Sequence, residues 1–237
     1  MSIQVKEWYN EFSTKQVKTS KNLRHYTLIN KIIDEGLNKH SKVLEIGCGI
    51  GTLTELLYKF IKKGQIVATD ISDISISIAK KNIGISNRIE YIVSDMVDFN
   101  YPQKFDFIIL PDVLEHIPIE NHNDLFGTIA KHMHSSSKII INIPHPKAIE
   151  FLKKVSPDKL QIIDQAINAK ELIENTSYTD LLLLKYNSYS IYDINFDYAF
   201  IVLTLNQEFE LNNKSKYEII FNKQFNKIKY YYLMLTS

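Results

Sequence analysis

The stretch VLEIGCGIG, residues 43–51, decides the fold of this chain. It contains most of the short apolar run KVLEI, residues 42–46, which is typical of a buried parallel strand. The glycines that follow let the backbone approach a ligand closely because no Cβ intrudes, and the next helix offers free N–H groups at its start. The stretch therefore predicts a strand, a turn and a helix that together hold a nucleotide-like molecule.

The spacing of the glycines separates the classes of nucleotide-binding turn. The dinucleotide fingerprint G-x-G-x-x-G, counted from Gly47, requires a third glycine at position 52, where the chain has Thr52. The glycines fall instead at Gly47, Gly49 and Gly51, and the acid Glu45 precedes them. This E-x-G-x-G-x-G arrangement does not match the dinucleotide template, so a nicotinamide-dependent dehydrogenase is disfavoured.

The chain around the turn alternates between strand and helix patterns. We expect strands at 42–46, 65–70, 88–95, 105–112 and 137–144, and helices at 51–62, 72–82 and 122–133. Beyond Pro144 we expect a helix at 169–176, strands at 180–190 and 197–205, and a final helix at 213–235. Repeated strand–helix units of this length imply a parallel sheet with helices on both faces.

Three later signals follow the turn in a recognisable order. Asp70 ends the second strand, 19 residues after Gly51. The tripeptide SDM, residues 94–96, ends the third strand, and LPDVLEHI, residues 110–117, ends the fourth. Together with the glycine turn, these signals resemble the class I S-adenosylmethionine-dependent methyltransferases. The resemblance covers roughly residues 40–145 and implies S-adenosylmethionine as cofactor and S-adenosylhomocysteine as product.

The resemblance also implies roles for residues at the cofactor. It assigns the ribose hydroxyls to Asp70 and the adenine to Asp95 with its adjoining backbone, although Asp70 is also a plausible helix cap and Asp95 a plausible turn residue. A cationic group of the cofactor would relieve the cost of a buried Glu45 carboxylate. We expect Cys48 to fill space between two glycines rather than act as a nucleophile. The expected cofactor-binding residues are Glu45, Gly47, Cys48, Gly49, Gly51, Asp70, Ile71, Ser94, Asp95, Met96, Pro111, Asp112 and Tyr9.

The resemblance completes the expected architecture. We expect an α/β fold, a Rossmann-like, parallel-dominated seven-stranded sheet with helices on both faces. No Pro/Gly-rich linker divides the chain, so residues 1–237 are expected to form a single methyltransferase domain. Within it we expect a helical N-terminal lid at 1–40, the core at 41–205 and a C-terminal extension at 206–237.

The residues at the methyl acceptor are less defined. His116 and His145 follow the fourth and fifth strands, where such sheets open to ligands, and both are catalytic candidates. His116 lies in a segment common to the family, so a structural or cofactor-associated role is equally open. Aromatic residues near the N-terminus resemble a lid, although ordinary helix packing also explains them. The expected acceptor-binding residues are Trp8, Phe12, His145 and Tyr189.

Composition limits the partners. The formal charge of +1 gives no general attraction to nucleic acid or an anionic membrane. No segment approaches the roughly 18 consecutive apolar residues of a membrane span, and no signal peptide is visible. A single cysteine suits a reducing compartment, so we expect a cytoplasmic protein with no DNA or membrane partner. We expect no metal and attribute His122, His132 and His134 to a surface helix.

These patterns favour methylation of a small molecule, with oxygen ahead of nitrogen as the atom that receives the methyl group. The segment LPDVLEH lacks the Asn/Asp-Pro-Pro-aromatic run of enzymes that methylate nucleic-acid amino groups. Three alternatives stay open: a small-molecule N-methyltransferase, a protein or RNA methyltransferase, and a non-catalytic protein that binds S-adenosylmethionine. A macromolecular acceptor would dock on a basic stripe of the N-terminal helix, formed by Lys15, Lys18, Lys21 and Arg24. Neither the acceptor nor the oligomeric state follows from the sequence.

Overall fold

The computed structural model of the chain describes residues 3–16, 21–208 and 214–236. It divides into two compact units, residues 1–206 and residues 207–237. The first unit contains the whole sheet, and the second contains helix α8 (Lys216–Thr236). The single-domain organisation expected from the sequence stays a prediction.

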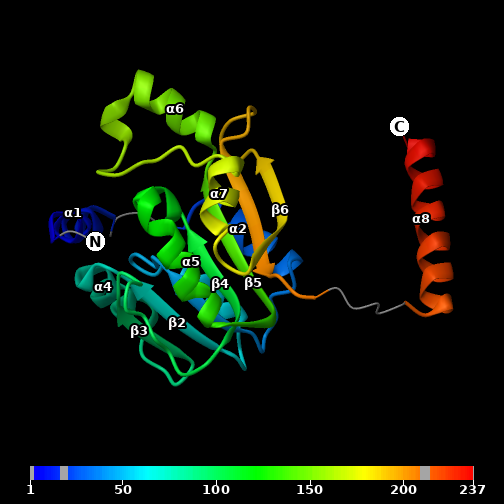
Figure 1. Ribbon diagram of the computed structural model, residues 1–237, viewed down its shortest axis with the longest axis horizontal. Coiled ribbons are helices and arrows are strands. Elements are labelled where there is room, and N and C mark those ends of the chain that lie inside the picture. Colours follow the sequence, from blue (N-terminus) through cyan, green and yellow to red (C-terminus); the bar gives the residue numbers. More distant parts are fainter. Residues whose placement is uncertain (1–2, 17–20, 209–213, 237) are drawn as a thin grey trace. The chain divides into compact units, whose positions relative to one another are not determined.

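The first unit is built on one sheet in the order β3-β2-β1-β4-β5-β7-β6 (Figure 1). All neighbours pair in parallel except β7, which is antiparallel to both β5 and β6. The strands are β1 (Lys42–Ile46), β2 (Gln65–Asp70), β3 (Ile89–Val93), β4 (Phe105–Pro111), β5 (Met133–Pro144), β6 (Leu181–Tyr189) and β7 (Tyr198–Leu205). The strand order reverses at β1 and β4, and such a reversal opens a ligand crevice beyond the carboxyl ends of the strands.

The helices of the first unit follow the expected alternation, with one addition. They are α1 (Ile3–Gln16), α2 (Leu23–Asp34), α3 (Thr52–Phe60), α4 (Asp73–Ile83), α5 (His122–Lys131), α6 (Pro146–Val155) and α7 (Ala169–Thr176). The sequence interpretation missed α6, although Pro146 in its first turn, after the capping residue His145, is a recognised start signal. The seven-stranded, parallel-dominated fold is confirmed.

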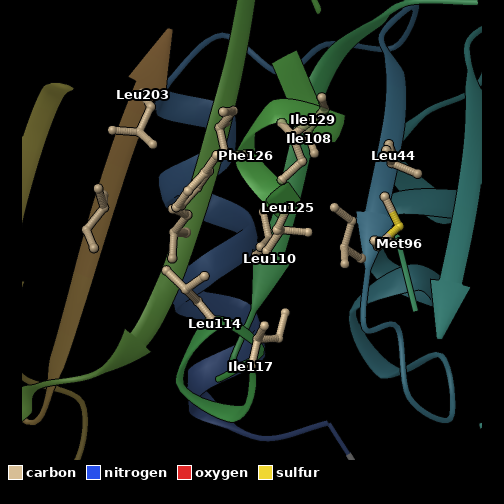
Figure 2. Close-up of a cluster of buried hydrophobic side chains, with 14 of the residues drawn as sticks. Leu44, Met96, Ile108, Leu110, Leu114, Ile117, Leu125, Phe126, Ile129 and Leu203 are labelled. Atoms are coloured by element: carbon tan, nitrogen blue, oxygen red, sulfur yellow. The ribbon is translucent and has the colours of Figure 1, made fainter. Parts of the chain in front are cut away.

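Two hydrophobic clusters cover the two faces of the sheet, as the sequence predicts. On one face, side chains of β1, β4 and β7 pack against α5 (Figure 2): Leu44, Ile108, Leu110, Leu125, Phe126, Ile129 and Leu203. On the other face, alternate strand residues such as Val43 and Phe107 meet Leu28, Ile32 and Leu57 of α2 and α3. Figure 1 shows α5 and α2 on opposite sides of the strands. Each such buried side chain contributes about 1.5–3 kcal/mol.

The N-termini of helices α3 and α4 lie at the crevice and are capped in different ways. Ser72 begins α4, and its hydroxyl accepts a hydrogen bond from Ser75 N, which matches the expected Ser-Asp capping signal. Helix α3 begins differently, because Gly51 at its N-cap has φ 86° and no side chain caps the helix. The start of α3 therefore leaves its first N–H groups to face a ligand.

Two sequence interpretations of surface residues are corrected. His122 and His132 are buried rather than on a surface helix face, and their rings bond to the backbone carbonyls of Ile117 and Thr128. His134 is in strand β5, where its Nε2 lies 2.9 Å from Asp106 Oδ1. The expected basic stripe fails at Arg24, which turns inward. Lys18 lies outside the described residues.

Two compositional expectations concern membranes and metals. Among the helices that the structure describes, none is long and apolar enough to pass through a membrane. The described residues also include no group of three or more His, Cys, Asp or Glu side chains arranged to hold a metal ion.

Candidate functional site

A cavity of about 530 Å³ lies at the carboxyl ends of the parallel strands. Its walls come from the turn after β1, from the ends of β2, β3 and β4, and from α1 and α2. Every residue expected at the cofactor lines this cavity except Gly51, which caps α3. The sheet therefore collects residues from position 9 to position 112 around one space.

The glycine turn forms one wall through its backbone. Gly47 and Gly49 have φ values of 73° and 52°, in the left-handed region that favours glycine. A Cβ on Gly47 would lie 2.2 Å from Cγ2 of Val113, so the space beside it accepts no side chain. Cys48 N donates to Thr69 O at 2.8 Å, which ties the turn to β2. The result is a fixed surface of bare backbone.

Asp70 joins that turn to the end of β2. Its Oδ2 accepts a hydrogen bond from Gly49 N at 2.8 Å, and its Oδ1 accepts one from Ser72 N at 2.9 Å. Burial raises the pKa of Asp70, and the two N–H donors oppose that rise. Each carboxylate oxygen keeps a further acceptor position, which suits a ligand with paired hydroxyl groups.

Glu45 is the most unusual group in the cavity wall. Its side chain is fully buried, and neither carboxylate oxygen has a hydrogen-bond partner among the described residues. Burial raises the pKa of Glu45 to about 8, and the charge of Asp70 adds to the rise while the nearby Thr54 hydroxyl opposes it. A buried carboxylate without a partner is costly, so this site favours a ligand with a cationic or proton-donating group.

Residues 94–96 close the wall at the end of β3. Met96 N donates to Ser94 Oγ at 3.0 Å, and Val97 N donates to Asp95 Oδ1 at 3.1 Å. Met96 has φ 70°, which is rare for a side-chain-bearing residue and typical of ligand sites. These bonds hold the expected adenine-binding segment in one conformation at the cavity.

A charged network forms another part of the cavity wall. Arg24 of α2 lies 3.2 Å from Asp112 Oδ2 through its Nη1, and the same nitrogen donates to Tyr198 Oη at 3.1 Å. Asp112 follows β4 with φ 54°, and its Oδ1 is buried without a hydrogen-bond partner among the described residues. Burial raises the pKa of Asp112, although Arg24 and His116 favour the ionised form. Asp112 thus lines the cavity and carries a buried acceptor oxygen within this wall.

His116 lies beside Asp112 in the short helix Leu114–His116. Its Nδ1 is 2.6 Å from Ile163 O and 3.2 Å from Asp164 Oδ1, and its Nε2 is 3.8 Å from Glu115 Oε1. Burial lowers the pKa of His116, but the two carboxylates and the carbonyl outweigh burial and raise it to about 9. The imidazole is therefore protonated near pH 7 and acts as a hydrogen-bond donor rather than as a base.

The residues expected at the acceptor divide into two groups. Phe12, together with Tyr9, lines the cavity from α1. Trp8 does not line it and packs on the rings of Tyr9 and Phe12, with centroids 5.1 and 4.9 Å away. Tyr189 donates to Asn142 Oδ1 at 2.7 Å, also outside the lining residues.

His145 is the third residue expected at the acceptor that does not line the cavity. It is the N-cap of α6, where its Nδ1 accepts a hydrogen bond from Lys147 N at 3.3 Å. Burial and the charge of Lys147 lower the pKa of His145, so the neutral form that can cap the helix is favoured. Its contact with an acceptor stays a prediction.

Sequence reasoning missed several lining residues. Asn22 and His25 form a capping box at the start of α2, a pattern that predicts a helix start but no ligand. The sequence places Arg24 on a basic stripe that faces solvent, an anionic substrate or a partner. Gln161 belongs to a loop without a motif, and its Oε1 is buried and unpartnered within the described structure. Only the fold brings these residues to one cavity.

Comparison with known proteins links this geometry to a family. Residues 43–136 match the family model described as a methyltransferase domain. Over 84 residues the chain is 37% identical to malonyl-[acyl-carrier protein] O-methyltransferase of Priestia megaterium, a match that covers 35% of this chain and 30% of that protein. The chain matches less than half the length of the first curated relatives.

Solved structures show the same fold. Magnesium protoporphyrin IX methyltransferase from Synechocystis PCC 6803 with bound SAH has a TM-score of 0.65 and 16% identity, covering 85% of this chain and 98% of that chain. The N-methyltransferase NodS from Bradyrhizobium japonicum WM9, in complex with S-adenosyl-l-homocysteine, has a TM-score of 0.65 and 15% identity, covering 84% and 100%. At these identities the likeness concerns the fold.

Proposed function

We propose that the chain carries a class I S-adenosylmethionine-dependent methyltransferase domain and methylates a hydroxyl group of a small molecule. The observation that carries the proposal is the buried, unpartnered carboxylate of Glu45 beside a glycine turn, in a cavity of about 530 Å³. The volume of this cavity lies within the range of sites that bind small molecules and cofactors.

The residues present fit S-adenosylmethionine. The cofactor supplies a methyl group that its positive sulfonium has already activated. Its cationic part would satisfy Glu45, directly or through water, and the bare backbone at Gly47 and Gly49 would admit it closely. Asp70 would accept hydrogen bonds from the ribose hydroxyls, and Asp95 with its neighbouring backbone would bind the adenine.

The wall that contains Arg24, Asp112 and His116 would hold the acceptor. A hydroxyl group has a proton to lose when it receives a methyl group, so it needs a nearby hydrogen-bond acceptor. We assign that role to Asp112 Oδ1, which is buried at the cavity with no partner among the described residues. The protonated His116 would orient the acceptor as a donor, and the lining aromatics Tyr9 and Phe12 would exclude water.

A second candidate is N-methylation of a small molecule. An amine also donates hydrogen bonds, so Asp112 would accept from it in the same way. The likeness to NodS, a solved N-methyltransferase, supports this alternative at the level of the fold.

The cofactor assignment is tested by calorimetry with S-adenosylhomocysteine. We expect the wild type to bind it and Asp70→Ala to bind about 100-fold more weakly, since two charge-assisted hydrogen bonds are lost. Asp98→Ala is the matched control, because Asp98 is exposed and outside the cavity, and it should keep wild-type affinity. Unchanged binding by Asp70→Ala would remove Asp70 from the site.

The reaction is tested by incubating the chain with methyl-labelled S-adenosylmethionine and a small-molecule extract of the source cells. We expect one labelled product whose methyl group is on oxygen. A label on nitrogen would establish the second candidate. Tight cofactor binding without transfer to small molecules, peptides or RNA would indicate a binding protein and contradict the proposal.

A further inference from the structure

Helix α8, residues Lys216–Thr236, forms the only helix of the second described unit and has its own start signal. Glu218 N donates to Ser215 Oγ at 3.2 Å, and Ser215 N donates to Glu218 Oε2 at 2.8 Å. This reciprocal pair is a capping box, which fixes where the helix begins. The helix is therefore specified locally rather than by the sheet of the first unit.

One side of α8 is apolar along its whole length. Apolar residues recur at steps of three and four, which places them on one face of a helix. They are between 49% and 87% exposed, and no other described residue of the second unit covers them: Tyr217, Ile220, Phe221, Phe225, Ile228, Tyr231 and Leu235. Tyr232 falls within the same arc, whereas three further exposed apolar residues, Ile219, Tyr230 and Met234, lie outside the stripe.

The polar positions of α8 carry a clear excess of positive charge. The helix has four lysines and one acid, Glu218. Lys216, Lys223 and Lys227 lie along one border of the apolar stripe, and Lys229 lies near the other border. Lysine at such a border can extend its ammonium group away from an apolar phase that its methylene chain enters. The charge complements an anionic surface.

The pattern distinguishes among possible partners for the stripe. Most of the stability of a helix in a protein comes from packing its apolar face, so α8 gains stability when something covers the stripe. A coiled-coil partner would require a narrow seam of Leu, Ile or Val, whereas this stripe is wide and rich in Tyr and Phe. Aromatic rings that combine an apolar body with a polar tip suit a membrane interface. A basic amphipathic helix is typical of an anionic lipid surface.

We propose that α8 binds the surface of an anionic membrane, with its apolar stripe in the interface and its lysines at the lipid head groups. The helix lies on the membrane rather than across it, since no described helix has the length and apolar character of a span. Residues 206–215 then connect this anchor to the unit that carries the cavity. This inference does not depend on the proposed methyl transfer.

Vesicle co-sedimentation of the full chain tests the proposal. We expect binding to vesicles of phosphatidylcholine with phosphatidylglycerol, and at least tenfold weaker binding to pure phosphatidylcholine. Lys223→Gln with Lys227→Gln should weaken binding roughly tenfold, and high salt should weaken the wild type in the same direction.

A matched pair of variants separates the stripe from the charge. Phe221→Ser with Phe225→Ser should weaken binding to anionic vesicles more than tenfold, because two buried rings are lost. Asn222→Ser with Asn226→Ser changes the same helix turns on the polar side and should bind like the wild type. S-adenosylhomocysteine affinity, measured on every variant, should stay unchanged if the first unit remains folded.

Three outcomes would overturn the proposal. The first is vesicle binding that the two Phe substitutions leave intact. The second is a wild-type protein that forms a dimer, does not bind vesicles and becomes a monomer when the two Phe residues are replaced. That result would identify a second copy of the chain as the partner. The third is a monomer that binds no vesicles, which would mean that the stripe is covered within the chain. Loss of cofactor affinity alone would bear on the proposed function and not on α8.

Discussion

The two walls of the cavity are built in different ways. The strand-end wall, from residues 45–49, 70–71 and 94–96, comes from consecutive strand–turn units and uses backbone groups and fixed carboxylates. The network wall joins Arg24, Asp112 and His116 with Tyr198 and Asp164, which are far apart in the sequence. Consecutive strand–turn units can be recognised from their sequence pattern. Charged side chains that come together from distant segments give no such pattern.

The two walls should also respond differently to substitution. In the strand-end wall a Cβ added to a glycine of the turn shifts the backbone, so we expect both cofactor affinity and folding stability to fall. In the network wall a truncated side chain leaves the backbone in place and removes charge or a hydrogen bond. We therefore expect the first wall to control cofactor affinity and the second to control turnover.

The largest effect is expected from Gly47→Ala in the strand-end wall. The new Cβ would meet Val113 Cγ2 at 2.2 Å, and the residue would keep φ near 73°. The left-handed conformation costs about 1–2 kcal/mol and overpacking about 1–3 kcal/mol. We expect affinity for S-adenosylhomocysteine to fall about 100-fold by calorimetry, with a lower Tm.

Gly127→Ala is the matched control for that substitution. Gly127 lies within α5, and a Cβ there would meet nothing within 4 Å, so the variant should keep wild-type affinity and gain up to about 1 kcal/mol of stability. Adding Val113→Ala to Gly47→Ala should recover part of the lost affinity. Wild-type affinity of the single Gly47→Ala variant would show that the turn does not contact the cofactor.

Much of the fold and the strand-end wall could be predicted from the sequence. The glycine spacing, Asp70 and the SDM segment all follow strands whose apolar runs are visible, so their shared edge follows from parallel pairing. The network wall could not be predicted, because a buried Arg24 looks like a surface residue until β4 and β7 surround it. His145 shows the opposite error, since its position after β5 indicated a ligand while its side chain caps α6.

A test of the network wall is Arg24→Ala. This substitution leaves the buried Asp112 without its cationic partner and releases Tyr198 Oη. We expect kcat/KM to fall roughly 30-fold, corresponding to about 2 kcal/mol for a charge-assisted hydrogen bond, with S-adenosylhomocysteine affinity within twofold of the wild type.

Lys21→Ala is the control from the same segment. Lys21 pairs with Glu55 of α3 and does not line the cavity, so kcat/KM should change less than twofold. Equal losses of kcat/KM in the two variants would mean that this segment affects turnover through its overall positive charge rather than through the contact between Arg24 and Asp112. A loss of cofactor affinity in Arg24→Ala would contradict our expectation that the network wall controls turnover and not cofactor binding.

A smaller effect is expected from the proton on Glu45. Its raised pKa, about 8, keeps the carboxyl protonated near neutral pH, and a bound cation would favour the ionised form. Cofactor binding should then release a proton, and affinity should rise a few-fold per pH unit up to about pH 8. In the free protein the same raised pKa makes folding stability fall as pH increases from about 4.5 to 8.

Calorimetry in buffers of different ionisation enthalpy measures that proton. The wild type should show a buffer-dependent binding enthalpy near pH 7, and Glu45→Gln, which cannot ionise, should show none. If the wild type released no proton, Glu45 would not change its charge when the cofactor binds, and the cation-binding role assigned to it would be wrong.

The smallest effect is expected from His145, which the sequence associates with the acceptor and the structure with a helix cap. His145→Ala removes the acceptor for Lys147 N at the start of α6, so stability should fall by about 0.5–1 kcal/mol while turnover changes less than twofold. His145→Asn supplies a good capping side chain without an imidazole and should restore stability. If His145→Asn were as stable as the wild type but lost transfer with cofactor affinity kept, His145 would act on the acceptor and the network wall would extend to β5. Thermal unfolding and initial rates of the three proteins decide between a cap and a catalytic group.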